Sequence, residues 1–422
     1  MNERAAAYKV LLKINKNNSY SNIALDSALK ESGSDVGSAL ITNLVYGTLE
    51  RQVTIDYVLS QFLKQPVEKT KPEILTALRL GAYQLLFTDK IPSFAAVNES
   101  VKIIKNSKFS YAAGLVNSVL RRISEKGFSY PETEDEVFDL SIKYSCPKAL
   151  TKHYIDNYGI ENAVDILSSS LGAAPIFLKV NTLKTNAEEL ISLFEKEGVK
   201  TEKKDEDVLI VSGNISLENL KAFEDGLFHV QDYSSYLCCK ALNVKENDTV
   251  LDVCASPGGK SFTLCEMMNN TGKIVSCDLY EQRVSLIKNG AVRLGLTNIS
   301  AIKNDASVFN SSFPLFDKVL CDVPCSGLGV IRRKKEIRFK NLSEFDNLCD
   351  MQYNILTVSS RYVRSGGALI YSTCTLNKKE NEDNCFRFLN EHKEFHPDDG
   401  GVNIFPGMYG SDGFYYARFI RE

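Results

Sequence analysis

Two short motifs contain cysteines whose neighbours suggest chemistry. Cys325 lies in residues 322–327, which read DVPCSG, and Cys374 lies in residues 371–375, which read YSTCT. A thiolate can add to C6 of a pyrimidine base, and this addition makes C5 reactive toward a methyl group. Asp322, three residues before Cys325, could hydrogen-bond the edge of the base as charge develops there. Cys374, Cys325 and Asp322 are therefore catalytic candidates for methyl transfer to a pyrimidine.

The other cysteines fit a structural role. A lone cysteine is most often a small buried hydrophobe. The chain has eleven cysteines without the density of a disulfide-stabilised domain, so we expect them to stay thiols in a reducing compartment. No spacing matches a zinc site, so we expect no metal. The cysteines expected to be buried hydrophobes are Cys254, Cys265, Cys277, Cys321 and Cys385.

A glycine turn lies upstream, at residues 252–260, which read DVCASPGGK and have the pattern of a strand, a turn and a helix start. Gly258 and Gly259 let a ligand approach the main chain closely, and backbone N–H groups at a helix start face such a ligand. The dinucleotide-binding fingerprint requires glycines where this chain has Cys254 and Ser256, and a P-loop also requires glycine at Cys254. The turn therefore fits neither phosphate-binding loop.

Carboxylates follow the next two predicted strands as well. Asp278 lies 26 residues after Asp252 and could accept hydrogen bonds from ribose hydroxyls, while Asp305 follows the third strand and could read an adenine amino group. Each acid taken singly also fits a helix cap or a turn. Three acids at successive strand ends fit an adenosine without phosphates, and S-adenosylmethionine is such a ligand.

The elements that must position these motifs alternate from residue 249 onward. Strand-like runs interleave with helical stretches, which predicts a parallel sheet with right-handed crossovers in a Rossmann-like α/β domain. Ligands bind beyond the carboxyl ends of the strands in such sheets, and each motif above lies at one of these ends. The predicted strands are residues 250–253, 274–277, 299–302, 318–321 and 368–371.

The first part of the chain has a different pattern. Apolar residues recur at three- and four-residue spacing from Arg4 to about Lys126, which predicts about six helices, with Pro72 in the first turn of one of them. Residues 127–136 have the composition of a linker. We therefore expect a multidomain chain, since single cores stop growing near 250–300 residues. The expected domains are an all-α domain at 1–130, a small α+β insert at 137–230 and the α/β domain at 231–422.

Composition and charge narrow the classes of protein. Hydrophobic residues make up 44% and charged residues 24%, as in globular proteins, and no apolar run reaches the roughly 18 residues of a membrane span. The chain opens without a signal-peptide pattern, so we expect a cytoplasmic protein with no membrane partner. Residues 1–130 carry 17 Lys and Arg against 11 Asp and Glu, although the whole chain has a net charge of −3. This positive segment fits RNA phosphates, and a solvated surface without a ligand explains it equally well.

A basic run follows the Cys325 motif directly. Residues 331–340, which read IRRKKEIRFK, hold six basic residues and one acid. Basic residues beside a catalytic loop, with Phe339 among them, suit an RNA strand whose target base is flipped out and stacked. A solvated charged helix is the alternative, and the adjacency to Cys325 favours RNA contact.

The motifs together resemble a known enzyme family. Residues 252–260, 322–327 and 372–375 are similar to the PGGK, DxPCSG and TC motifs of the RNA 5-methylcytosine methyltransferases, the NOL1/NOP2/Sun family. Segments 4–14, 44–59 and 78–102 resemble the NusB-like RNA-binding domain that is fused to the enzyme in bacterial 16S ribosomal RNA methyltransferases of this family. The similarity continues at 226–232, 330–333 and 410–417. The chain departs from the usual residues at Ser256, Val323 and Thr375, and it has no tryptophan.

This resemblance implies roles for particular residues. Cys374 would be the nucleophile and Cys325 would assist product release, on a cytosine of 16S ribosomal RNA, with S-adenosylmethionine as cofactor and a monomeric enzyme. Two other functions stay open, a tRNA cytosine-C5 methyltransferase and a non-catalytic RNA-binding ribosome assembly factor. The residues that would hold the cofactor are Cys254, Ala255, Ser256, Pro257, Gly258, Gly259, Lys260, Asp278, Arg283, Asp305 and Asp322.

Overall fold

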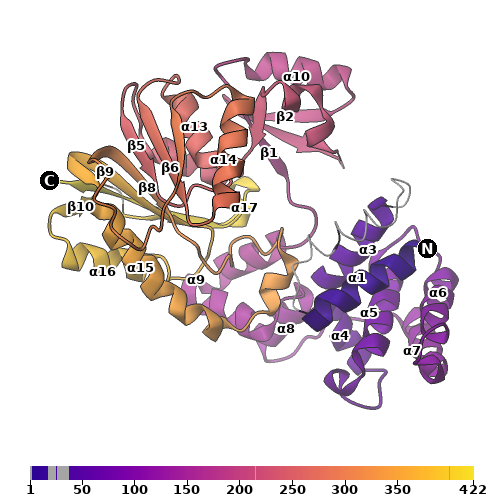
Figure 1. Cartoon of the computed structure of the whole chain (residues 1–422). Coiled ribbons are helices and arrows are strands. Elements are labelled where there is room, and N and C mark those ends of the chain that lie inside the picture. The colour runs from indigo at the N-terminus through magenta and orange to yellow at the C-terminus, as the bar shows by residue number, and fades with distance from the viewer. Residues whose placement is uncertain (1, 18–24, 26–37, 214, 399) are drawn as a thin grey trace. The chain divides into compact units, whose positions relative to one another are not determined.

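The computed structural model describes residues 2–17, 25, 38–213, 215–398 and 400–422. The chain divides into two compact units (Figure 1). Unit 1 consists of Met1–Gly172 together with Ile331–Lys340, and unit 2 consists of Ala173–Val330 together with Asn341–Glu422. Unit 1 is helical, whereas unit 2 contains both sheets of the described structure.

Unit 1 is built from helices around one hydrophobic core. Pro72 occupies the first turn of α5, as predicted, where its missing N–H costs no helical hydrogen bond. Gly81 lets α5 approach α7, because a Cβ at this position would lie 2.5 Å from the Leu120 side chain. The helices are α1 (Glu3–Asn17), α3 (Ser38–Glu50), α4 (Gln52–Ser60), α5 (Pro72–Phe87), α6 (Ser93–Lys105), α7 (Ala113–Lys126), α8 (Glu136–Lys143) and α9 (Lys148–Ser169), with short 3₁₀ helices η1 (Val67–Lys69) and η2 (Ser110–Ala112).

The basic run Ile331–Lys340 folds into unit 1 and contains another short 3₁₀ helix, η4 (Lys335–Phe339). Arg338 is only 1% exposed, and Lys335 forms an ion pair with the buried Glu50. The Arg338 guanidinium donates to four main-chain oxygens at 3.1–3.4 Å, those of Glu50, Ser145, Ser170 and Ile331. For Arg338 and Lys335, RNA contact was therefore the wrong interpretation, because both cations are used inside the protein.

The smaller sheet of unit 2 is antiparallel, in the order β2-β3-β1-β4, and α10 packs on it. Asn186 caps α10 by accepting a hydrogen bond from the Glu189 N–H at 2.9 Å. The elements are β1 (Ile176–Val180), α10 (Ala187–Lys196), β2 (Lys200–Asp205), β3 (Val208–Ser212), η3 (Leu217–Asn219), α11 (Lys221–Glu224) and β4 (Phe228–Val230), followed by α12 (Tyr233–Leu242).

The larger sheet has the strand order β10-β12-β9-β8-β5-β6-β7, with β11 paired to β12. The five predicted strands form its parallel part, whereas β10, β11 and β12 add an antiparallel edge that the sequence pattern did not predict. The elements are β5 (Thr249–Asp252), α13 (Gly259–Met267), β6 (Lys273–Asp278), α14 (Glu281–Leu294), β7 (Ile299–Lys303), β8 (Phe316–Asp322), η5 (Leu342–Phe345), α15 (Asp346–Ser360), β9 (Val363–Thr373), α16 (Glu382–Glu391), β10 (Phe395–Pro397), β11 (Val402–Ile404), α17 (Pro406–Tyr409) and β12 (Phe414–Arg421).

Helices cover both faces of this sheet, since successive residues of its strands belong to different cores. Val250 and Ile370 pack in a cluster with α12, α13 and α14, whereas their neighbours Leu251 and Leu369 pack in a cluster with α15 and α16. The chain runs from β5 outward through β6 and β7 and then returns to β8 on the other side of β5. The carboxyl ends of β5 and β8 therefore form a topological switch point, where such folds bind ligands. Among the described helices, none is long and apolar enough to cross a membrane.

Candidate active site

The two predicted catalytic cysteines lie side by side. Strands β8 and β9 are parallel neighbours, with Asp322 opposite Ser372, so the loop after β8 and the end of β9 meet at one edge of the sheet. The Cys325 Sγ and Cys374 Sγ atoms are 3.3 Å apart, both residues are partly exposed, and both are free thiols. A proton can thus be shared between the two sulfur atoms.

The pair is electrostatically asymmetric. The pKa of the Cys325 thiol lies well above its ordinary value, first because of its hydrogen bond to Cys374, then because of burial and the nearby charge of Cys374. The carboxylates of Glu380 and Asp322 raise it further. Cys325 therefore keeps its proton when Cys374 is a thiolate. In that state, Cys374 can act as a nucleophile and Cys325 can donate a hydrogen bond.

Asp322 and Lys260 link the cysteine loop to the glycine turn. The Lys260 Nζ atom is 2.8 Å from Asp322 Oδ2, and the Ser372 hydroxyl donates to Asp322 Oδ1 at 2.8 Å. Burial lowers the pKa of Lys260, but the Asp322 carboxylate together with Cys238 and Cys239 more than offsets this, so that the lysine pKa is raised overall. Lys260 is thus a cation whose charge is already balanced by Asp322.

The glycine turn from Cys254 to Lys260 connects β5 to α13. The Ala255 N–H donates to the Cys277 carbonyl at 2.8 Å, which ties the turn to β6. Gly258 has φ +116°, and a Cβ there would lie 2.2 Å from the Phe262 ring. This position therefore requires glycine both for its conformation and for its close packing. The turn also contains Ser256, Pro257 and Gly259.

The strand-end acids have three different environments. Asp278 is 6% exposed, accepts a hydrogen bond from the Tyr280 N–H at 3.1 Å, and lies 3.8 Å from the exposed Arg283 guanidinium. Asp305 is exposed and caps a turn by accepting hydrogen bonds from the Ser307 N–H and hydroxyl. Asp278 and Arg283 thus lie close together after β6. Asp305 has the geometry of a turn residue, which was the alternative to its proposed contact with adenine.

Asp252 differs from the other two strand-end acids because it is inside the protein. It is 1% exposed and accepts a hydrogen bond from the Ser261 hydroxyl at 2.7 Å. Burial raises its pKa to about 7. Asp252 therefore lies beneath the start of α13, and its placement favours a structural role.

Most of the other cysteines are buried, as predicted. Cys265, Cys277, Cys321 and Cys385 are 0–6% exposed, and burial raises the pKa of Cys277, Cys321 and Cys385 to about 12. Cys254 differs because it is partly exposed at the end of β5. These buried thiols would stay protonated at neutral pH, whereas Cys325 and Cys374 are partly exposed.

Several residues around the cysteines were absent from the sequence interpretation. Glu380, Gln352 and Asn377 converge behind the Cys325 loop, and Ser372 bonds Asp322. The run N-K-K-E after the Cys374 motif places Asn377 and Glu380 three residues apart, and this spacing is the signal that could have drawn attention to them.

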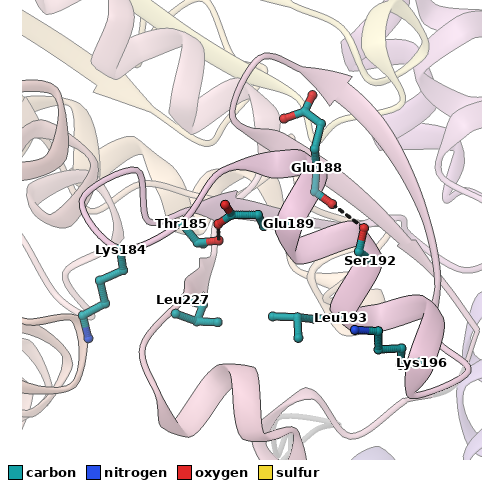
Figure 2. Close-up of a pocket in the computed structure, with 8 residues that line it drawn as sticks. All are labelled: Lys184, Thr185, Glu188, Glu189, Ser192, Leu193, Lys196 and Leu227. Atoms are coloured by element: carbon teal, nitrogen blue, oxygen red, sulfur yellow. Dashed lines mark hydrogen bonds between the residues drawn. The ribbon is translucent and has the colours of Figure 1, made fainter.

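A hollow in the surface lies elsewhere in unit 2. It has a volume of about 570 Å³ and lies on the insert beside α10 (Figure 2). Among its polar residues, Thr185 donates to Glu189 and the Ser192 hydroxyl to the Glu188 carbonyl, while the Lys184 and Glu188 side chains bond to residues outside the hollow. None of its lining residues is a predicted site residue. Within the described part of the chain, no group of three or more His, Cys, Asp or Glu side chains could hold a metal ion.

Three family models match successive parts of the chain. Residues 1–125 match the NusB family, residues 146–218 match the ferredoxin-like domain of RsmF/B-like methyltransferases, and residues 239–420 match the family described as 16S rRNA methyltransferase RsmB/F. These matches confirm the predicted fold class, with an all-α NusB-like N-terminal domain, a small α+β insert and an α/β methyltransferase domain.

Known proteins match over the whole length. The probable ribosomal RNA small subunit methyltransferase B of Bacillus subtilis is 39% identical and covers 99% of this chain and 98% of its own, and that of Synechocystis sp. is 30% identical over 99% of both. The crystal structure of PH0851 covers 100% of this chain and 99% of its own with a TM-score of 0.82 and 26% identity.

The crystal structure of NSun6 from Pyrococcus horikoshii with SFG shares the fold. It has a TM-score of 0.60 and 22% identity, and the match covers 65% of this chain and 98% of the other. Because the Bacillus subtilis relative matches from end to end, this chain belongs to the 16S rRNA methyltransferase RsmB/F family and is an rRNA methyltransferase with an N-terminal NusB domain.

Proposed function

We propose that this enzyme methylates C5 of a specific cytosine in 16S ribosomal RNA, using S-adenosylmethionine and a covalent bond between Cys374 and C6 of the base. The observation that carries the proposal is the 3.3 Å contact between the Cys325 and Cys374 sulfur atoms. The two cysteines lie three residues beyond Asp322 and two residues beyond Ser372, which are opposite each other on neighbouring strands. Addition and elimination at a pyrimidine require a nucleophilic thiol and a second group that aids release, and two neighbouring thiols can supply both.

The residues of the glycine turn fit S-adenosylmethionine. Lys260 is neutralised by Asp322, so the turn offers no free cation to a phosphate, and Asp278 at the end of β6 offers a carboxylate to ribose hydroxyls. The residues from Cys254 to Lys260 would hold the cofactor together with Asp278, Arg283, Asp305 and Asp322. The bound cofactor supplies the methyl group as an electrophile.

The protein's own groups carry the remaining steps. The Cys374 thiolate adds to C6 of cytosine and its electron pair passes through the ring to C5, which takes the methyl group. Asp322, held by Lys260 and Ser372, would accept a hydrogen bond from the amino group on the cytosine edge and so orient the base. A water molecule then takes the C5 proton, the C6–S bond breaks, and its electron pair returns to Cys374 as the thiolate. Cys325, which keeps its own proton, assists this release by donating a hydrogen bond to the departing sulfur.

Substrate RNA separates this proposal from the alternatives. Purified enzyme with labelled cofactor should transfer methyl groups to small-subunit rRNA from a strain lacking the enzyme and not to tRNA from the same strain. Transfer to the tRNA alone would establish the tRNA function. Binding of the rRNA without transfer would establish the non-catalytic assembly factor.

The two cysteines are assigned by covalent trapping. Cys374→Ala should abolish transfer while cofactor affinity, measured by calorimetry, stays near that of the native protein. Cys325→Ser should leave a protein–RNA adduct that survives denaturant, because elimination is slowed. An adduct in Cys374→Ala and none in Cys325→Ser would reverse the two roles. Cys321→Ala, which alters a buried thiol of the preceding strand, serves as the matched control and should form no stable adduct.

A further inference from the structure

Behind the cysteine pair lies a buried carboxylate with no assigned role. Glu380 is 0% exposed and is surrounded by donors. The Ser326 N–H and Gln352 Nε2 donate to its Oε2 atom at 2.9 and 2.8 Å, and the Ser326 hydroxyl and Asn377 Nδ2 donate to its Oε1 atom at 2.5 and 2.9 Å. All four contacts are donors, and each carboxylate oxygen accepts two of them.

The same network reaches both sides of Cys325. Ser326, which follows Cys325, is bonded to Glu380 through its main chain and its side chain. Pro324, which precedes Cys325, has its carbonyl bonded by Gln352 Nε2 at 2.9 Å, and Gln352 also donates to Glu380. The short loop that carries the Cys325 thiol is thus fixed at both ends by groups that converge on one carboxylate.

The network also extends to the residue after Cys374. The Thr375 hydroxyl lies 2.6 Å from the Ser326 hydroxyl, and it accepts a hydrogen bond from the Leu328 N–H at 3.2 Å. Glu380 is itself anchored, because the Tyr371 hydroxyl donates to its main-chain carbonyl at 2.6 Å. One polar network therefore bonds the residues next to both cysteines.

We propose that Glu380 is a positioning residue that holds the Cys325 loop against Cys374 and thereby controls elimination of the methylated base. The inference rests on the proposed covalent mechanism. The charge of Glu380 supports the same role, because Glu380 is one of the groups that raise the pKa of Cys325. The larger causes are the hydrogen bond to Cys374 and burial. Glu380 touches no reacting atom, so it acts through Cys325.

The test compares Glu380→Gln with the native enzyme. A glutamine offers one acceptor oxygen instead of two and presents an NH₂ group to donors, so hydrogen bonds in the network must be lost. We expect steady-state turnover to fall about tenfold to a hundredfold, the size expected when hydrogen bonds to a buried charged group are lost. Single-turnover methyl transfer and the KM for cofactor should change less than about threefold, and a denaturant-resistant protein–RNA adduct should accumulate.

Two further variants separate positioning from general destabilisation. Gln352→Met removes one donor while keeping the side-chain length, and it should give the same adduct in smaller amount. Glu266→Gln is the matched control, because Glu266 is also buried, at 2% exposed, but pairs with Lys179 away from Cys325 and Cys374. It should lower the melting temperature without forming an adduct.

Failure of the positioning role of Glu380 and failure of the proposed function give different results. If the native enzyme transfers no methyl group, the proposed function is wrong and Glu380 has no reaction to assist. If the native enzyme is active, and folded Glu380→Gln and Gln352→Met both turn over normally without adduct, the positioning role is refuted. Equal losses in single-turnover transfer and in turnover would likewise overturn it, because they would place Glu380 before elimination.

Discussion

Arg338 allows the sharpest test of how this protein uses its basic residues. The cation lies in a run that its sequence marks as RNA-binding, yet it is 1% exposed and donates to four main-chain oxygens inside unit 1. Replacing it by methionine keeps the length of the side chain and removes every donor. We therefore expect Arg338→Met to destabilise unit 1.

The magnitude follows from the contacts. A hydrogen bond from a charged donor contributes about 1.5–3 kcal/mol, and distances of 3.1–3.4 Å place these four toward the lower value, for a gross contribution of about 6 kcal/mol. Burying the guanidinium costs several kcal/mol, a cost that methionine does not have. The net loss on substitution should therefore be about 3 kcal/mol.

Hydrogen exchange is the appropriate assay, because a chain of two units need not unfold in one step. Main-chain amides of α3 and α9, whose carboxyl ends supply two of the acceptors, should exchange roughly a hundredfold faster in Arg338→Met. Lys334→Met is the control, since Lys334 is exposed in the same run and its loss should change stability by less than about 0.5 kcal/mol.

One result would refute the reasoning. If Arg338→Met kept native exchange rates in α3 and α9 but bound rRNA more weakly than Lys334→Met, Arg338 would be an RNA contact. The hydrogen bonds to the four carbonyl groups would then contribute nothing measurable to the stability of unit 1.

Two further predictions concern the β5 end of the sheet. Gly258→Ala should weaken S-adenosylmethionine binding in calorimetry and cost about 1–3 kcal/mol of stability, because of its positive φ and the overlap with Phe262; native affinity and stability would contradict this. Asp252 has a folded pKa of about 7, above its unfolded value of about 3.9, so it binds a proton more tightly when folded and its contribution to stability is lost as pH rises toward 7. Asp252→Asn should therefore stabilise the protein more at pH 8 than at pH 5, by up to about 3 kcal/mol, which melting temperatures at the two pH values would show; a pH-independent effect would rule this out.

The parallel part of the fold was predictable because its signals are local. Apolar runs such as 250–253 and 318–321 are bounded by turn residues, and the carboxyl ends of parallel strands necessarily share one edge of a sheet. The antiparallel strand β12 was not predicted, because its pairing with β9 depends on residues more than 40 positions away. Strand order, which places β8 beside β9, is likewise a tertiary property.

The site shows the same division. The two cysteine motifs were identifiable from residue types, but the 3.3 Å contact between their sulfur atoms required the strand order. Glu380 and Gln352 were missed because their role depends on meeting at one point from separate elements. Arg338 was misjudged because a run of charges reports composition, whereas burial is decided by what packs around each side chain.

The placement of Ile331–Lys340 within unit 1 also has a consequence for synthesis on the ribosome. N-terminal domains usually fold as soon as they emerge, at roughly 5–20 residues per second of elongation. Unit 1 lacks Arg338 and Lys335 until residue 340 has been made, long after Gly172. For roughly ten to thirty seconds, the carbonyl groups of Glu50, Ser145 and Ser170 in the nascent helical unit therefore lack their hydrogen-bond donor. Chaperones can bind the unit in this incomplete state.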